Sequence, residues 1–250
     1  MFVAVSSASF PDLSMAEMLD VLLDLQFSHF ELDVHEQQGH LKPSSVLANL
    51  DDAIDNCRAT RRLTICALNL GITAEGETYY EQFAACCKLA KAVKVVTLVV
   101  PSAELGTPFN AEVERLQRLV SIASMEGAVV ALKTETGCMT ESADTAKSFC
   151  DHVKGLGLTL DPSHYIYGPM QGASYDHILP YVCHVHLRDT TKNRLQVRVG
   201  QGEVEYGRLI TQLQKLRYSR ALCIDMMPME GVEHAPEVRK MRLLLESLLM

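Results

Sequence analysis

The fold of this chain is decided by two stretches, Leu158-Thr-Leu-Asp161-Pro-Ser-His164 and His184-Val-His186-Leu-Arg188-Asp189. Asp161 ends the apolar run that begins at residue 156, and His186 ends the run that begins at residue 181. Each of these polar side chains therefore stands where a predicted strand finishes. The carboxyl ends of strands are the places where α/β proteins build their sites.

Short β-rich runs alternate with amphipathic stretches along the whole sequence. The expected strands are 2–6, 29–34, 63–69, 94–100, 128–134, 156–161, 182–187 and 221–226. The expected helices lie near 14–26, 43–58, 76–91, 109–126, 141–153, 174–180, 206–216 and 235–249. Ser14 with Glu17 forms a capping-box pattern, and Thr140 before Glu141 is a second start signal.

Strands that are each followed by a helix predict a (β/α)₈ TIM barrel, with a doubly wound open sheet as the alternative. No Ser-, Gly- or Pro-rich linker interrupts the pattern, so we expect one domain over residues 1–250. Side chains alternate between the two faces of a strand, so the residues that share the inside with the polar strand ends can be predicted. They are Gly157, Thr159, Val182, His184, Ala221, Cys223, Val129 and Ala131.

The amino-acid composition indicates which class of molecule the chain binds. Of the 250 residues, 48% are apolar, and 31 Asp and Glu outnumber 23 Lys and Arg for a net charge of −8. Binding nucleic acid requires clustered positive charge, so we expect a small-molecule substrate and no nucleic-acid partner. No apolar run approaches the roughly 20 residues that span a bilayer, so no membrane partner is expected. A homo-oligomer is compatible with the sequence.

The cysteines and the first residues indicate the compartment. The eight cysteines are scattered, form no Cys-x-x-Cys pair and mostly lie in apolar segments, which is typical of small buried core residues. The start, Met1-Phe-Val-Ala-Val-Ser-Ser, lacks a basic region and indicates a first strand rather than a signal peptide. We therefore expect a reducing, cytoplasmic location.

Two residues at strand ends have the chemistry of metal ligands. A carboxylate oxygen from Asp161 and a neutral imidazole from His186 suit Mn, Zn, Co or Mg. The alternatives are that Asp161 caps the turn before Pro162 and that His186 is a hydrogen-bonded core residue. His164, three residues past Asp161 in an expected loop, could bind metal or cover the barrel mouth, and holding a substrate hydroxyl is the favoured role.

Other polar residues near these strand ends leave alternatives open. Arg188 and Asp189 either position an anionic substrate or pair with one another. Glu31 lies on the inner face of the second strand, and because an unpaired buried carboxylate is costly, it lines the site or has an ionic partner. The stretch 199–204, Val-Gly-Gln-Gly-Glu-Val, lacks the spacing of a nucleotide motif and is either a plain turn or a flexible lid.

Together these motifs resemble the xylose isomerase-like TIM barrels, the sugar phosphate isomerase/epimerase superfamily that also contains endonuclease IV. The resemblance covers nearly the whole chain. It rests on Phe30-Glu31-Leu32, Leu160-Asp161-Pro-Ser-His164, His184-Val-His186-Leu-Arg188-Asp189, Gly200-Gln-Gly202-Glu-Val-Glu and Tyr218-Ser-Arg-Ala-Leu-Cys-Ile-Asp225. The Asp-x-x-His and His-x-His pieces are fairly specific in this order.

The resemblance implies a site for one divalent metal. Its ligands in the family's epimerases are a glutamate ending strand five, an aspartate ending strand six, a histidine ending strand seven and a glutamate ending strand eight. The last three correspond to Asp161, His186 and Asp225. Lys133 stands where the first glutamate is expected, and Glu135 would supply that ligand if the strand shifted by two residues.

A lysine at this position would repel a dication. Two unit charges about 4 Å apart interact by roughly 4 kcal/mol at an effective dielectric near 20. The alternative to a bound metal is therefore a metal-free site in which the Lys133 ammonium neutralises Asp161 and Asp225.

The activity that the resemblance implies is that of a sugar isomerase or epimerase of carbohydrate metabolism, which transfers a proton next to the carbonyl of a small sugar or keto acid. Lys133, Glu135 and Asp225 are the candidate catalytic residues, with Glu31, His164 and Arg188 as substrate-binding residues. The alternatives are a dehydratase on the same scaffold and a barrel that binds a carbohydrate-like ligand without turnover. An endonuclease IV-like role is disfavoured, because strand three ends at Asn69 and the expected Asp-x-His is absent before the glycine loop.

Overall fold

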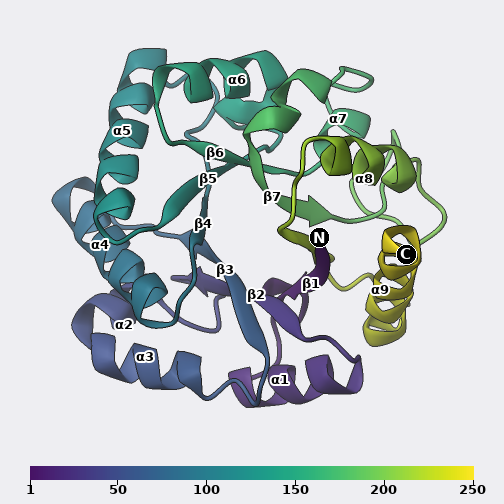
Figure 1. Ribbon diagram of the computed structural model, residues 1–250, viewed down its shortest axis with the longest axis horizontal. Coiled ribbons are helices and arrows are strands. Elements are labelled where there is room, and N and C mark those ends of the chain that lie inside the picture. The colour runs from purple at the N-terminus through teal and green to yellow at the C-terminus, as the bar shows by residue number, and fades with distance from the viewer.

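Eight parallel strands close into a barrel in a computed structural model that describes residues 1–250 (Figure 1). The strands follow one another around the barrel in chain order, and β8 pairs with β1, so the sheet has no free edge. Their bounds are β1 (Phe2–Ser6), β2 (His29–His35), β3 (Thr64–Gly71), β4 (Thr97–Val100), β5 (Val129–Lys133), β6 (Gly157–Leu160), β7 (Val182–Leu187) and β8 (Ala221–Ile224). The predicted TIM barrel is confirmed, and the open sheet is excluded because the barrel closes.

Helices form a ring around the outside of the barrel (Figure 1). The α-helices are α1 (Met15–Asp24), α2 (Pro43–Ala48), α3 (Leu50–Arg58), α4 (Gly76–Ala92), α5 (Phe109–Met125), α6 (Ala143–His152), α7 (Ser163–Ile166), α8 (Tyr206–Lys215) and α9 (His234–Leu249). Three short 3₁₀ helices are η1 (Ser7–Ser9), η2 (Met139–Glu141) and η3 (Asp176–Tyr181). No helix is long and apolar enough to cross a membrane.

Two helix predictions differ from the structure in the residue that caps a helix. The helix expected over 43–58 is divided at Asn49, whose side chain accepts a hydrogen bond from the backbone N–H of Asp52 and so caps α3. The start signal at Thr140 is wrong, because Ser142 caps α6 and the Thr140 hydroxyl donates to the carbonyl of Lys133 instead. The capping box between Ser14 and Glu17 is present as predicted.

The core lies in two layers. A cluster of 57 buried residues fills the space between the strands and the helices. Inside the barrel the apolar side chains are small and form two clusters, Ala4 with Ala221 and Cys223, and Ala67 with Val99 and Ala131. These small side chains deep inside the barrel leave room for larger polar side chains near the carboxyl ends of the strands.

The inward position predicted for Val182 is wrong. The pairing of β6 with β7 skips one residue between Leu158–Val182 and Thr159–His184, so β7 contains a bulge at Cys183. Val182 therefore packs with the outer core, while Cys183 contacts the small cluster inside the barrel. The bulge leaves His184 and His186 on the same face, as predicted.

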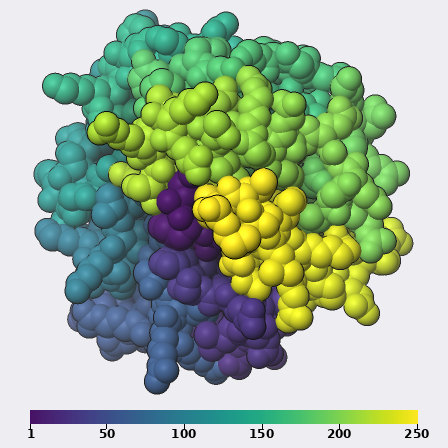
Figure 2. Space-filling view, turned by 45° about the vertical axis from the view of Figure 1, so that its right-hand side comes forward, coloured from purple at the N-terminus to yellow at the C-terminus, as the bar shows by residue number.

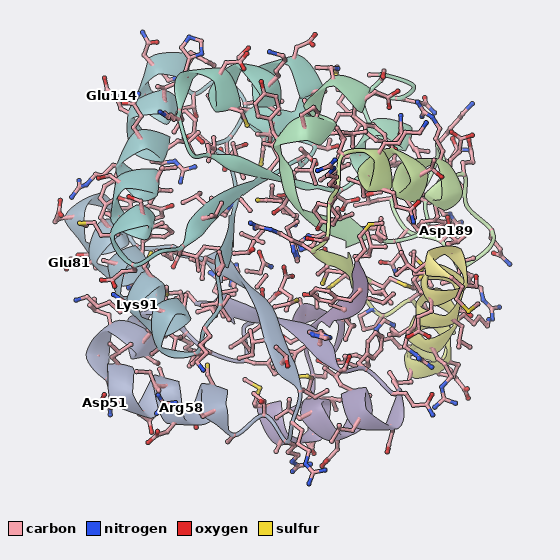
Figure 3. All side chains as sticks on the ribbon, in the orientation of Figure 1. Asp51, Arg58, Glu81, Lys91, Glu114 and Asp189 are labelled. Atoms are coloured by element: carbon pink, nitrogen blue, oxygen red, sulfur yellow. The ribbon has the colours of Figure 1, made fainter.

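The labelled Asp51, Glu81 and Glu114 lie on the outer, exposed side of their helices (Figure 3). Strand side chains fill the middle of the ring in the same view. The first residues of the chain, purple in Figure 2, are visible between segments from the last quarter of the chain, in yellow-green and yellow. This agrees with the contacts of β1 with β8 and α9, which join the two ends of the chain.

Candidate active site at the barrel mouth

Arg188 is the centre of the polar cluster at the carboxyl ends of the strands. It follows β7, and its Nη2 donates to Asp161 Oδ2 at 2.9 Å and to Asp225 Oδ2 at 2.7 Å. Asp161 follows β6 and Asp225 follows β8, so one guanidinium joins the ends of three strands. All three residues are buried. Arg188 therefore pairs with these two carboxylates and not with Asp189.

Asp161 also anchors the turn after β6. Its Oδ1 accepts hydrogen bonds from the backbone N–H and the hydroxyl of Ser163, and its own N–H donates to Thr134 Oγ1 at 2.9 Å. Burial would raise the pKa of Asp161, but the Arg188 guanidinium and His164 lower it well below its usual range. Asp161 is thus an ionised carboxylate that both caps its turn and faces the mouth.

His164 lies in the one-turn helix α7 rather than in a loop. Its Nδ1 accepts from the backbone N–H of Thr136 at 3.2 Å, which leaves the proton on Nε2 in the neutral ring. Nε2 is 3.5 Å from Asp161 Oδ2. Burial lowers the pKa of His164, so the neutral ring, with its Nε2–H on the side of Asp161, is the dominant form at neutral pH. A donor in this position suits a substrate hydroxyl.

Lys133 and Glu135 lie on the β5 side of the same opening. Lys133 Nζ is 3.7 Å from Glu135 Oε1, and their side chains are 17% and 34% exposed, respectively. Burial would lower the pKa of Lys133, but the charges of Asp225 and Glu135 raise it above its ordinary value. Lys133 is therefore a charged ammonium at neutral pH.

His186 turns its two ring nitrogens toward different neighbours. Nε2 is 2.9 Å from Glu31 Oε2, deeper in the barrel, and Nδ1 is 3.4 Å from Asp225 Oδ2 at the mouth. His184 Nε2 lies 2.9 Å from the same Glu31 oxygen, outside hydrogen-bond geometry. Glu31 is fully buried, and its ionic partners are two histidines rather than an arginine. Glu31 thus lies deeper in the barrel than the polar residues around Arg188 at the carboxyl ends of the strands, which we call the mouth cluster.

Asp33 belongs to the mouth cluster but was missed as a candidate. It follows Glu31 on the same face of β2, and its Oδ1 accepts from Asn69 Nδ2 at 3.0 Å. Burial and the charges of Glu31 and Asp225 raise the pKa of Asp33 to about 7. The alternation of β2 placed Asp33 on the inside, and this was the only signal in the sequence that could have found it.

Asp189 holds the glycine-rich loop in place. Its Oδ2 accepts from the backbone N–H groups of Gly200 at 2.8 Å and Gly202 at 3.0 Å. A Cβ on Gly202 would lie 1.9 Å from Asp189 Oδ1, so only glycine fits there. The loop is therefore an anchored turn, the first of the two predicted alternatives.

The mouth residues do not fit a divalent cation at the position that the family resemblance implies. Arg188 Nη2 already lies within hydrogen-bond distance of both Asp161 and Asp225. Lys133 stands where the family resemblance implies a glutamate ligand, and an ammonium in place of a carboxylate adds two positive charges, the same charge that a divalent metal would bring. The cluster is thus already supplied with positive charge by the chain itself.

The comparisons with known proteins agree with this fold. The family model for xylose isomerase-like TIM barrels matches residues 19–246. The chain therefore belongs to the xylose isomerase-like TIM barrel family. A sequence search of curated proteins finds no match.

Several solved structures share the barrel at low sequence identity. A xylose isomerase-like TIM barrel protein from Mycobacterium smegmatis in complex with magnesium is 17% identical with a TM-score of 0.79, and the match covers 99% of this chain and 97% of that one. A 3-keto-D-glucoside 4-epimerase from E. coli is 15% identical with a TM-score of 0.75 and 99% of both chains covered. A probable 3-DHS dehydratase from Bacillus anthracis is 13% identical with a TM-score of 0.74, covering 98% of this chain and 99% of that one.

Proposed function

We propose that this protein is an isomerase or epimerase that moves a proton at the carbon next to the carbonyl of a small sugar or keto acid, with cations of the chain in place of a mouth metal. The observation that carries the proposal is the bridge from Arg188 to Asp161 and Asp225, with Lys133 beside it. Fixed charges in a buried site stabilise an enolate as it forms, because they need no reorganisation during the reaction.

Lys133 is the residue that polarises the substrate carbonyl in this proposal. Because its pKa is raised, its ammonium keeps its proton at neutral pH and acts as an electrophile rather than as a base. When the C–H bond next to the carbonyl breaks, its electron pair moves to the carbonyl oxygen, and the Lys133 ammonium balances the negative charge that develops there.

Asp33 is the proposed acceptor of the proton. Asp161 and Asp225 are both paired with Arg188, and Glu135 faces Lys133, whereas Asp33 accepts a hydrogen bond only from the neutral amide of Asn69. A carboxylate held by a neutral donor is a stronger base than one held by a cation.

Glu135, whose side chain is 34% exposed, is the proposed second acid: it takes up a proton from solvent and gives it to the enolate from the β5 side, while Asp33 releases the abstracted proton to solvent. Asp225 keeps Arg188 and His186 in position. His164 and Arg188 hold substrate oxygens, since His164 has its Nε2–H on the side of Asp161 and Arg188 is fixed at the mouth by two carboxylates. A dehydratase would use the same enolate, with His164 as the donor to a leaving hydroxyl. The dehydratase among the structural neighbours makes this the second candidate.

The test is proton exchange in deuterated water. The protein is incubated with a panel of four- to six-carbon ketoses, their phosphates and 2-keto acids, and deuterium at the carbon next to the carbonyl is followed by NMR. We expect exchange with at least one class of compound, with product of unchanged mass apart from deuterium. Loss of water would favour the dehydratase, and binding of a panel compound without exchange would favour a non-catalytic barrel and contradict the proposal.

A further inference from the structure

Below the mouth cluster, four buried side chains with different donor atoms converge inside the barrel. They are the carboxylate of Glu31, the imidazoles of His184 and His186, and the thiol of Cys223. One donor atom from each lies within 4.8 Å of the others, and none of the four residues is more than 1% exposed. They come from β2, β7 and β8, so the strands themselves hold them in place.

Hydrogen bonding among these residues leaves polar atoms without partners. Both histidines direct Nε2 at the same oxygen of Glu31, Oε2, while the other oxygen, Oε1, has no partner. His184 Nε2 also lacks a partner in hydrogen-bond geometry. The Cys223 thiol has only a weak contact with the carbonyl of Ile224 at 3.9 Å. Buried polar atoms without partners cost about 1–3 kcal/mol each, so a ligand that used them would stabilise the fold.

We propose that these four residues form a structural zinc site inside the barrel, separate from the mouth. Two imidazole nitrogens, one thiolate and one carboxylate make the donor set that zinc prefers, and the soft sulfur disfavours magnesium and manganese. Tetrahedral zinc holds its ligands about 3.3–3.8 Å apart, which these side chains reach with shifts of about 1 Å. Deprotonated Glu31 and Cys223 balance the charge of the ion.

Asp225, the neighbour of His186 on the side of the mouth, also fits a zinc site at His186. With Nε2 on the metal, the proton lies on Nδ1, which is 3.4 Å from Asp225 Oδ2. A ligand histidine that donates its other N–H to a carboxylate is the usual arrangement around zinc, because the carboxylate fixes the orientation of the ring. The ion would thus hold His186, and through it Asp225, in place at the mouth.

A cavity at the opposite end of the barrel borders one of the four donors, His184. It has a volume of about 330 Å³ and opens among the first residues of the strands, and its lining includes Phe2, Cys66, Arg220 and His184. Cys66 lines the cavity but is not among the four converging donors, so it provides a matched control for Cys223.

Elemental analysis and cobalt spectroscopy test the site. Tag-free protein is desalted, its zinc content is measured, and Co²⁺ is then exchanged for zinc. We expect one equivalent of zinc per chain and, with Co²⁺, a thiolate-to-cobalt charge-transfer band in the near-ultraviolet. The band should disappear in Cys223→Ser and persist in Cys66→Ser and Asp161→Asn. A mouth site would give no such band, because its donors are oxygen and nitrogen.

Several results would overturn the zinc site. These are the absence of bound metal, bound cobalt without the charge-transfer band, or loss of the band in Cys66→Ser but not in Cys223→Ser. If Cys223→Ser does not fold, the cobalt spectrum of the unmodified protein still decides between a site with sulfur and a site without it. Proton exchange on ketoses plays no part in this test, so its outcome is independent of the proposed activity.

Discussion

Lys133 is the residue at which this chain departs most clearly from the metal-dependent pattern that its motifs resemble. If its ammonium stabilises the enolate, Lys133→Met should lower the rate of proton exchange by about 10²- to 10³-fold, the usual effect of losing one group that stabilises developing charge. Exchange is followed by NMR in deuterated water. Lys88→Met, at an exposed position of α4, is the control and should leave the rate unchanged.

Asp33 is predicted to be the proton acceptor, and the amide Asp33→Asn keeps its shape while removing its basicity. We expect exchange to fall by about 10²- to 10⁴-fold, as for loss of a general base. Binding of the substrate, measured by calorimetry, should change much less. Asp51→Asn on the outer face of α3 is the matched control. Full activity in Asp33→Asn would assign the base to Glu135 or Asp225 instead.

Arg188 is predicted to stabilise the folded state as well as the site. Arg188→Met would leave Asp161 and Asp225 close together in a buried place without their shared cation. Removing one partner from a buried ionic group costs about 3–5 kcal/mol, because the remaining charge is uncompensated. Urea unfolding measures this loss. A change below about 1 kcal/mol, typical of exposed ion pairs, would show that the bridge contributes little.

The sequence predicted which residues gather at the mouth better than it predicted their partners. Asp161, His186, Asp225 and Lys133 were found because each lies near the end of a strand, and all strands of a parallel barrel end at the same face. The bridge made by Arg188 depends on how β6, β7 and β8 are placed around the closed barrel, which local pattern does not specify. The raised pKa of Asp33 likewise depends first on burial inside the closed barrel, and then on the charges of Glu31 and of Asp225, which comes from β8.

At the scale of the elements, the loop that follows β7 is held by Asp189 and needs a glycine. Gly202→Ala would place a Cβ 1.9 Å from Asp189 Oδ1 and 2.6 Å from the carbonyl oxygen of Thr190. We expect a destabilisation of about 1–3 kcal/mol, because the carboxylate must move from its backbone partners. Thermal and urea unfolding provide the measurement.

Gly207 in α8 is the control for Gly202. No atom lies within 4 Å of a Cβ added there, and the position is helical and exposed. Gly207→Ala should therefore be neutral or stabilise the protein by up to about 1 kcal/mol, the difference in helix propensity. Equal effects of the two substitutions would contradict the anchored loop.

The elements themselves were largely predictable, since alternating strands and amphipathic helices each leave a period in the sequence. Two local features of the elements could not be predicted from the sequence. The break at Asn49 uses a side-chain cap within a stretch whose apolar period continues on both sides, so the pattern predicted one helix. The bulge at Cys183 changes the face of Val182 without changing composition, so alternation carried through from His186 placed Val182 on the wrong side.

At the scale of the whole molecule, two half-buried histidines outside the site predict how stability depends on pH. Desolvation by partial burial lowers the pKa of His40 and of His234. A lowered pKa in the folded state means that the unfolded chain binds protons more readily. The stability that these rings contribute is present above about pH 6.5 and is lost as the pH falls through their folded pKa values.

Melting temperatures between pH 7.5 and pH 5 measure this dependence. We expect the melting temperature to fall with pH, and the fall to be smaller in His40→Phe and His234→Phe, which remove the titrating rings. His152→Phe, on the outer end of α6, is the comparison variant, since its ring is exposed. The same slope in all variants would show that other groups control acid stability.

Binding of Mn²⁺ measures whether the cations Lys133 and Arg188 take the place of a divalent metal at the barrel mouth. Manganese prefers oxygen and nitrogen donors and is disfavoured by the sulfur of the inner site. Titration calorimetry and electron paramagnetic resonance measure its binding to the unmodified protein and to Lys133→Glu. We expect no Mn²⁺ bound by the unmodified protein at millimolar concentration and measurable binding by Lys133→Glu, abolished by adding Asp161→Asn. One equivalent of Mn²⁺ bound by the unmodified protein and lost in Asp161→Asn would contradict this expectation.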